Sequence, residues 1–229
     1  LTTGRAVNVD DPGTFTSISL NGGHQRGNTD YDVTIIRIAL VVPQGANCLS
    51  IDFQFLSEEY PKFVGSLFND AFVAELDISN WTTSGSTISA PNNFAFDPDG
   101  RVVSINSTGV ARMNRINGSG TAYDGGINGG SNTDGAATVL LRASKPVNPG
   151  VHTLYLSIFD QGDRFYDSAV FLDNLFVGTV SANQCQPGVV IPPTYTPTPT
   201  RTPTRTKTPT PTRTPTRTPT RIPTRTPTI

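Results

Sequence analysis

The sequence predicts an all-β fold: a single antiparallel β-sandwich of the jelly-roll type, followed by an extended, non-globular C-terminal tail. Apolar runs rich in Val, Ile, Leu and Phe recur at intervals of roughly ten to fifteen residues, with Gly, Pro, Asn and Asp between them. None of these runs repeats its apolar residues at the helical period. From Thr194 onward the chain is almost entirely Thr, Pro and Arg, a composition that cannot bury a core.

We therefore expect a β domain at residues 1–186, a linker at 187–193 and a repeat tail at 194–229. Charge divides the chain in the same way. The tail holds seven of the 17 Lys and Arg residues and none of the 18 acids, which leaves ten positive residues and a net charge of −8 for the rest. An acidic domain is not expected to bind nucleic acid, whereas the basic tail of one copy would be attracted to the domain of another.

Turn residues separate the predicted strands. Pro43 ends the first strand because proline cannot donate a hydrogen bond to a sheet. The sequence Pro98-Asp99-Gly100 is typical of a tight turn between the fourth and fifth strands. The segment at residues 60–68 predicts at most one turn of helix. The predicted strands, in order, are residues 33–42, 48–57, 70–78, 93–97, 101–106, 137–144, 151–160 and 168–180.

Acidic residues concentrate where these strands begin and end. Two of the three glutamates in the chain are adjacent at the end of the second strand, and further acids surround the last hairpin. If both regions meet at one end of the sandwich, their carboxylates would repel one another unless a cation lay between them, and oxygen ligands suit Ca²⁺. The alternative is ordinary turn chemistry, since Asp and Asn bond local backbone in loops. The predicted ligands are Glu58, Glu59, Asn69, Asp70, Asp160, Asp163 and Asp167.

Catalytic signatures are weak. The two histidines, His24 and His152, have no nucleophile in a recognisable arrangement. Nucleophile-elbow, zinc and phosphate-loop motifs are missing from the sequence. A pair of carboxylates would suffice for a glycosidase, but such pairs are very unspecific. We expect a protein that is not an enzyme.

The two cysteines leave two interpretations open. Cys48 begins the second predicted strand, and Cys185 follows the last one. A disulfide would close a loop of roughly 138 residues, for which the chain-entropy relation gives about 5 kcal/mol as an upper figure. It would also anchor the point where the tail leaves the domain. The alternative is two free, buried cysteines.

The tail has a period of two. Threonine fills every even position from Thr194 to Thr228 except 222, and Pro, Arg or Lys fills most odd positions. A solvated polyproline II stalk carrying O-linked glycans fits this composition. A strand donated to another copy also fits, because all threonines would then pair along one edge while the prolines face away. The predicted O-glycosylation sites are Thr198, Thr200, Thr202, Thr204, Thr210, Thr214, Thr216, Thr218, Thr220, Thr224 and Thr226.

Several longer segments resemble a known family. FQFLSEEYPKFVGSLFNDAFVAELD and PVNPGVHTLYLSIFDQGDRFYDSAVFLDNL are similar to the choice-of-anchor L domain of bacterial exported surface proteins, and the resemblance covers nearly all of residues 1–186. It implies a secreted, extracellular or cell-surface β domain without catalytic activity. No apolar run reaches 18 residues, so we expect no membrane span. The opening LTTGRAVNV would suit a mature, already cleaved N-terminus, and no sorting signal or cell-wall motif is recognisable after the tail.

These observations together predict an extracellular structural protein, the subunit of a surface fibre or layer assembled through extended terminal segments. Its expected partners are other copies of itself, in a homopolymer, and covalent glycans on the tail, with surface polysaccharide as a further possibility. The alternative is a calcium-dependent carbohydrate-binding or adhesion module displayed on a stalk. In that case Tyr60, Phe63, Phe165 and Tyr166 would be near the site and able to stack on a sugar.

Overall fold

The computed structural model describes residues 1–191 apart from positions 13, 15, 20–21, 110–111 and 127–133. One compact unit spans Leu1–Pro192. The repeat tail, including the predicted O-glycosylation sites between Thr198 and Thr226, lies outside the described residues.

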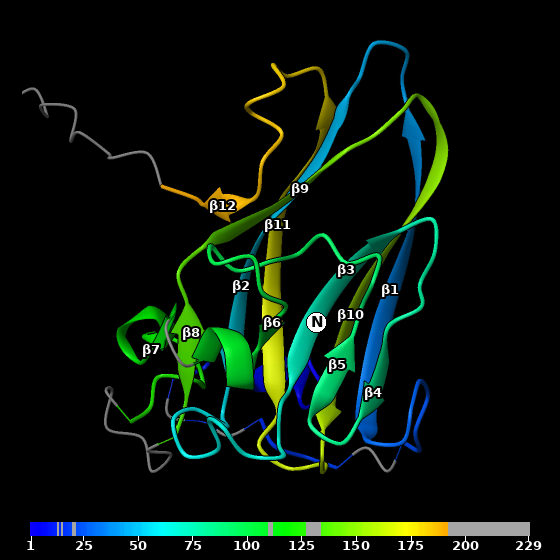
Figure 1. The fold of residues 1–229 in the computed structure, drawn as a ribbon. Coiled ribbons are helices and arrows are strands. Elements are labelled where there is room, and N and C mark those ends of the chain that lie inside the picture. Colours follow the sequence, from blue (N-terminus) through cyan, green and yellow to red (C-terminus); the bar gives the residue numbers. More distant parts are fainter. Residues whose placement is uncertain (13, 15, 20–21, 110–111, 127–133, 192–229) are drawn as a thin grey trace, which may run out of the picture. The chain divides into compact units, whose positions relative to one another are not determined.

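The domain consists of two antiparallel sheets and a separate hairpin (Figure 1), which confirms the all-β prediction. The first sheet has the order β1 (Asp30–Val42), β10 (Gly150–Gln161), β3 (Ala71–Leu76), β6 (Val103–Ser104). The second has the order β12 (Gly188–Val189), β9 (Leu141–Pro146), β2 (Cys48–Ser57), β8 (Ala136–Thr138), β7 (Met113–Asn114), with β11 (Ser168–Gly178) on the other side of β2. The hairpin is β4 (Thr82–Ser84) and β5 (Thr87–Ser89), and the helical turns are η1 (Ala6–Asn8), η2 (Ile105–Gly109) and η3 (Ile116–Gly118).

The core lies between the two sheets and follows from the alternation of side chains along the strands. In β2, Leu49, Ile51, Phe53 and Phe55 are all fully or nearly fully buried and belong to one apolar cluster. The opposing sheet contributes Phe72, whose ring centroid lies 5.1 Å from that of Phe53. Burial of each such side chain stabilises the fold by about 1.5–3 kcal/mol. The two sheets are therefore joined by one continuous core.

A smaller core covers the outer face of the first sheet. Trp81, at the entrance to the β4–β5 hairpin, stacks on Phe159 of β10 with ring centroids 4.0 Å apart. Ala71 and Val73 of β3 belong to the same cluster. The guanidinium of Arg26 lies 5.4 Å from the centre of the Trp81 ring. The hairpin, which the sequence analysis did not anticipate, thus buries a face that would otherwise be exposed to solvent.

Some strand boundaries differ from expectation. Residues 93–97 form only isolated bridges, because the amide of Asn93 accepts hydrogen bonds from the backbone N–H groups of Ala74 and Ala95, both at 3.0 Å. The predicted strand at 101–106 shortens to β6 and continues into η2. At the other end of the chain, β12 pairs with β9, and the N–H of Val190 donates to the carbonyl of Leu140. The domain therefore extends past the expected boundary at residue 186.

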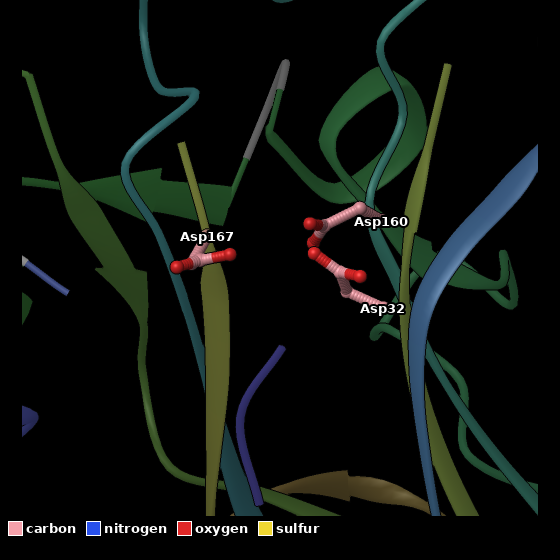
Figure 2. A group of neighbouring side chains, drawn as sticks. All are labelled: Asp32, Asp160 and Asp167. Carbon is pink, nitrogen blue, oxygen red and sulfur yellow. The ribbon is translucent and has the colours of Figure 1, made fainter. Parts of the chain in front are cut away.

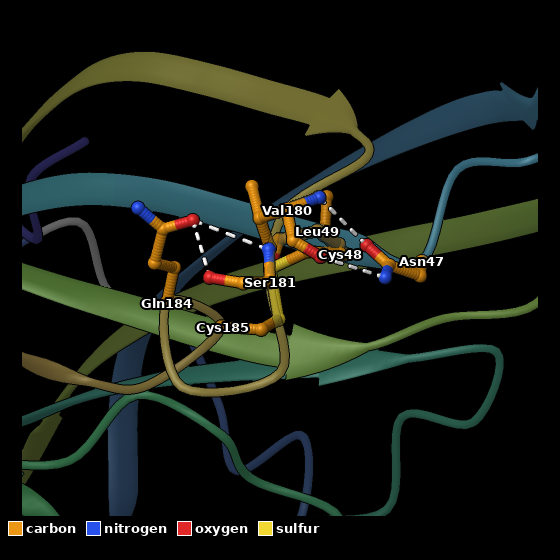
Figure 3. Close-up of a disulfide and its surroundings, with 7 residues drawn as sticks. All are labelled: Asn47, Cys48, Leu49, Val180, Ser181, Gln184 and Cys185. Carbon is orange, nitrogen blue, oxygen red and sulfur yellow. Dashed lines mark hydrogen bonds between the residues drawn. A yellow bond between two sulfur atoms is a disulfide. The ribbon is translucent and has the colours of Figure 1, made fainter.

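Cys48 and Cys185 form a disulfide, with their Cα atoms 5.7 Å apart (Figure 3). Asn47 holds the same region from the other side: its side chain donates to the carbonyl of Val180 at 2.9 Å and accepts from the N–H of Val180 at 3.0 Å. The segment that follows β11 is thereby fixed to the start of β2. In the part of the chain that the structure describes, no helix is long and apolar enough to cross a membrane.

Candidate functional sites: a buried acidic cluster and an open sheet edge

The ends of four strands meet at one end of the sandwich. Tyr31, near the start of β1, is opposite Asp160 near the end of β10. Ser57, the last residue of β2, is opposite Ser168, the first residue of β11. The acids that the sequence places at these strand ends are therefore brought together. We call six of them the acidic cluster: Asp32, Glu58, Glu59, Asp70, Asp160 and Asp167, each at most 2% exposed.

Three members form the centre of this cluster. One carboxylate oxygen from each of Asp32, Asp160 and Asp167 lies within 4.8 Å of the others. Figure 2 shows the carboxylates of Asp32 and Asp160 turned toward each other, with Asp167 facing them. The sequence analysis did not include Asp32. It reaches the cluster because β1 is irregular between Tyr31 and Thr34, where Asp32 adopts a φ of 41°, a conformation that Asp tolerates better than most residues.

Asp167 and Asp160, the two carboxylates grouped with Asp32, differ in the hydrogen bonds that they accept. The Oδ2 atom of Asp167 accepts a hydrogen bond from the N–H of Ile18 at 2.8 Å, and its Oδ1 accepts one from the hydroxyl of Thr3 at 3.2 Å. Asp160 is equally buried, yet neither of its carboxylate oxygens has a hydrogen-bond partner among the described residues. An uncompensated buried carboxylate is costly, so Asp160 requires an explanation.

The remaining acids surround this centre. Asp70 accepts hydrogen bonds from the hydroxyl of Ser168 at 2.7 Å and from the N–H of Gln161 at 3.1 Å. The N–H of Asp70 in turn donates to Glu59 at 3.3 Å. On the other side of the cluster, Oε1 of Glu58 accepts two bonds of 2.9 Å from the N–H and hydroxyl of Thr16. The second oxygen of Glu58 is buried with no partner in the described part of the chain.

Burial and mutual repulsion raise the pKa values of these carboxyl groups. Burial is the main cause for Asp70, whose pKa rises to about 8, and for Glu58 and Asp167, whose pKa values rise to about 7. The pKa values of Glu59 and Asp160 are also well above their ordinary range, first through burial and then through the charge of Asp70. No described Lys or Arg forms an ion pair with any of these five acids. Without a cation, burial and repulsion therefore favour the protonated forms of these carboxyl groups near neutral pH.

Two predicted ligands are engaged elsewhere. The Oδ1 atom of Asn69 accepts from the N–H of Asn106 at 2.8 Å, and its Nδ2 donates to the carbonyl of Ser86 at 3.1 Å. Asp163 is half-buried and accepts from the N–H of Phe165 at 2.9 Å, which closes the turn between β10 and β11. Asp163 therefore organises local backbone, as the turn-chemistry alternative expects, whereas Asn69 joins backbone segments that are distant in the sequence.

The second feature is an open edge of the sandwich. β1 is the edge strand of the first sheet, and β11 is an edge strand of the second. Residues 1–3 lie between them as a short added strand: Leu1 exchanges backbone hydrogen bonds with Val170, and Thr2 forms a bridge with Ala169. Thr34 of β1 donates its hydroxyl to the carbonyl of Thr2 at 3.0 Å. This short segment thus closes one end of the edge.

The open edge continues beyond residues 1–3 as a groove of about 330 Å³, which we call the edge groove. Among the described residues, β1 from position 35 and β11 from position 171 pair with no strand other than β10 and β2, respectively. Asp173 and Asn174 lie at the rim, where β11 contains a bulge. The apolar lining is Ile36, Ile38, Ile51, Leu156, Leu172 and Leu175.

The third feature is a hollow of about 440 Å³ beside the acidic cluster. Its lining includes Tyr31, Asp163, Arg164 and Phe165. Arg164 lies over the Tyr31 ring, with its guanidinium carbon 4.9 Å from the ring centre, and Phe165 is 59% exposed. Of the four aromatics expected near the site, Phe165 alone lines this hollow, whereas Phe63 packs against Tyr166 with ring centroids 5.1 Å apart.

Comparison with known proteins supports the resemblance on which the sequence analysis relied. The profile of the choice-of-anchor L domain matches residues 1–175, more than half of the chain. No curated protein and no solved structure matches the chain. The matched region includes all six acids of the acidic cluster and most of the open edge. The chain therefore belongs to the choice-of-anchor L domain family, a family of surface-associated bacterial proteins.

Proposed function

We propose that this protein is an extracellular structural subunit, in which an extended segment of one copy adds to the open edge of the next copy to build a surface fibre or layer. The pairing of residues 1–3 with β11 carries this proposal, because it places an extended peptide between the two sheets and leaves the adjoining groove open. The homopolymer and the glycans on the tail belong to the same proposal.

The chemistry of the edge suits the addition of a strand. An unpaired edge presents backbone donors and acceptors, which favour pairing with another chain. Backbone pairing would supply affinity, and apolar contacts with the groove would supply specificity. Ile36 is 42% exposed and Leu175 is 41% exposed, so both offer apolar surface to an incoming segment.

The tail provides a suitable donor segment. Its threonines occupy alternate positions, so in an extended conformation their N–H groups all point to one side. The prolines would face away and lose no hydrogen bond. The tail carries seven positive charges, while the rest of the chain has a net charge of −8, with Asp173 at the rim of the groove. Charge attraction of this kind speeds association between copies.

Electron microscopy of the purified full-length chain tests the proposal with a matched pair of variants. Ile36→Glu places a charge in the edge groove, whereas Val41→Glu changes a residue on the same strand that is 77% exposed and lies outside the groove lining. We expect Ile36→Glu to abolish fibres and Val41→Glu to retain them. Deletion of residues 192–229 should also abolish them. Fibres in all three proteins would contradict the proposal.

A second candidate function is supported by the hollow beside the acidic cluster. Phe165 is exposed at the tip of a loop, next to an arginine and a carboxylate. An aromatic face with a few polar groups around it is suited to a sugar ring. If the domain binds surface polysaccharide there, Phe165→Ala should remove binding to a glycan array while Phe171→Ala, 38% exposed on β11, should not. Equal binding by both variants would contradict this function.

A further inference from the structure

We propose that the acidic cluster binds one Ca²⁺ ion, with Asp32, Asp160 and Asp167 supplying the central carboxylate oxygens. The inference concerns the stability of the domain and is independent of the proposed assembly at the edge groove.

Asp160 is the observation that points to a cation. Its side chain is 1% exposed, and both of its carboxylate oxygens lack a hydrogen-bond donor among the described residues. Each of the other five acids of the cluster accepts at least one hydrogen bond from a backbone or hydroxyl donor, so Asp160 is the member of the cluster for which neither oxygen has a donor among the described residues. Buried charges in proteins are paired or coordinate a metal. No Lys or Arg of the described chain pairs with Asp160, so a bound metal ion is the partner that would hold this side chain in its ionised form.

The spacing of the oxygens fits the ion. Ca²⁺ binds oxygen ligands at about 2.3–2.6 Å, so two ligands on opposite sides of it are separated by up to about 5 Å. One oxygen from each of the three aspartates lies within 4.8 Å of the others. The three oxygens can therefore contact a common ion with small adjustments of the side chains.

The composition of the site favours calcium over other divalent ions. The ligands are carboxylates, and no described cysteine or histidine belongs to the cluster, which argues against zinc and copper. Mg²⁺ requires a near-ideal octahedron at about 2.1 Å and usually retains several waters. All three aspartates are buried, whereas a Mg²⁺ site usually keeps contact with several waters. Calcium accepts six to eight ligands in flexible geometry, so backbone carbonyls of the surrounding loops can complete its shell.

The ion would also fix the N-terminal segment. Thr3 and Ile18 both donate hydrogen bonds to Asp167, and a Cβ atom at Gly4 would lie 1.8 Å from Oδ2 of the same carboxylate. A cation that holds Asp167 in place therefore holds the turn around Gly4 and the strand at residues 1–3. We expect calcium to slow hydrogen exchange of the backbone amides at residues 2–4 and 16–18.

Calorimetric titration of the chelator-stripped, full-length protein with CaCl₂ tests the inference, with thermal unfolding measured on the same samples. We expect one calcium site per chain, weaker binding of MgCl₂ and a calcium-dependent rise in the melting temperature. Asp160→Asn and Asp32→Asn should each weaken calcium binding by about 100-fold or more, because even outer-shell changes cost 10–100-fold. Without calcium, Asp160→Asn should also have a higher melting temperature than the wild type, since it removes a repelling charge. Such a melting transition would show that the variant folds.

Asp163→Asn is the matched control, because Asp163 is a nearby acid whose carboxylate closes its own turn. It should bind calcium as the wild type does. Heat-neutral titration with no change in melting temperature, or unchanged calcium affinity in both Asp160→Asn and Asp32→Asn, would overturn the inference. Loss of binding in Asp163→Asn with retention in Asp160→Asn would assign the ion to a different site and overturn it as well.

Discussion

The hydroxyl of Thr3 donates a hydrogen bond to Oδ1 of Asp167 at 3.2 Å, across a sequence separation of 164 residues. Thr3 belongs to the short strand that pairs with β11, and Asp167 belongs to the centre of the acidic cluster. This one hydrogen bond therefore connects the N-terminal strand with the acidic cluster, although the two are far apart in the sequence. A change in the position of Asp167 would therefore be transmitted to the N-terminal segment through Thr3.

Gly4→Ala tests the packing at this connection. The added Cβ would lie 1.8 Å from Oδ2 of Asp167 and 2.5 Å from the carbonyl of Thr16. Since Asp167 is held by Ile18, the clash cannot be relieved by a simple rotation. We expect a loss of about 1–3 kcal/mol, as for other overpacked sites, which lowers the melting temperature by several degrees. Gly23→Ala, where the added atom meets nothing within 4 Å, should leave the melting temperature unchanged.

The pH dependence of stability follows from the raised pKa values of the cluster. Glu58 and Asp167 have pKa values of about 7, and Asp70 of about 8, against 4.5 for glutamate and 3.8 for aspartate in the unfolded chain. The folded protein therefore binds more protons than the unfolded chain between pH 4 and pH 8, and its stability falls as the pH rises through this range.

Urea unfolding in the presence of a chelator, at pH 5, 6, 7 and 8, measures this dependence. The midpoint should decrease steadily with pH, and Asp70→Asn should flatten the decrease. Added calcium should restore the midpoint most strongly at pH 8, where the ionised fraction of these carboxyl groups is highest over the range measured. A midpoint that is constant or rises over this range would contradict the assignment of the cluster as buried, repelling acids.

The disulfide should contribute substantially to stability. It joins residues 137 positions apart, and closure of a loop of this length corresponds to about 5 kcal/mol as an upper figure. We expect the double variant Cys48→Ser/Cys185→Ser to lose several kcal/mol in urea unfolding. Reducing agent should produce the same loss in the wild type and none in the double variant. Equal stability of the wild type with and without reducing agent, with the bond shown to be broken, would contradict this expectation.

We expect the smaller core on the outer face of the first sheet to stabilise the fold as much per buried side chain as the main core does. Phe159 is fully buried and stacks on Trp81, so Phe159→Ala should cost about 3–5 kcal/mol. It should also shift the emission of Trp81, which is the single tryptophan of the chain. Phe165→Ala, which removes a ring that is 59% exposed, should change the unfolding free energy little. Similar losses in the two variants would show that the stacking of Trp81 on Phe159 does not anchor the hairpin.

The long central strands could be predicted because the apolar residues that face the core recur with a period of two, as at Leu49, Ile51, Phe53 and Phe55. The expected segment 48–57 coincides with β2, and 151–160 lies within β10. Short strands could not be predicted in this way. The β4–β5 hairpin is polar, and its position depends on Trp81 packing on Phe159, a contact between residues far apart in the sequence. Such tertiary contacts leave no local pattern.

The acidic cluster was predictable to the extent that its acids mark strand ends. Glu58, Asp70 and Asp167 all flank strands that meet at one end of the sandwich. Asp32 directly precedes the predicted strand at residues 33–42, so the same criterion would have included it. In the structure β1 begins earlier, at Asp30, and Asp32 turns inward through a local irregularity of the backbone. A usable clue was the pair of aspartates in the segment Asp30-Tyr31-Asp32, because Asp is depleted in strands.

Cryo-electron microscopy of fibres assembled from the full-length protein tests whether copies join by strand addition. We expect density for an extended segment of a neighbouring copy in the edge groove, paired with the free edge of β11 beyond Val170 and packed against Ile36 and Leu172. Fibres in which this groove is filled only by solvent, with contacts between copies elsewhere on the domain, would contradict this expectation.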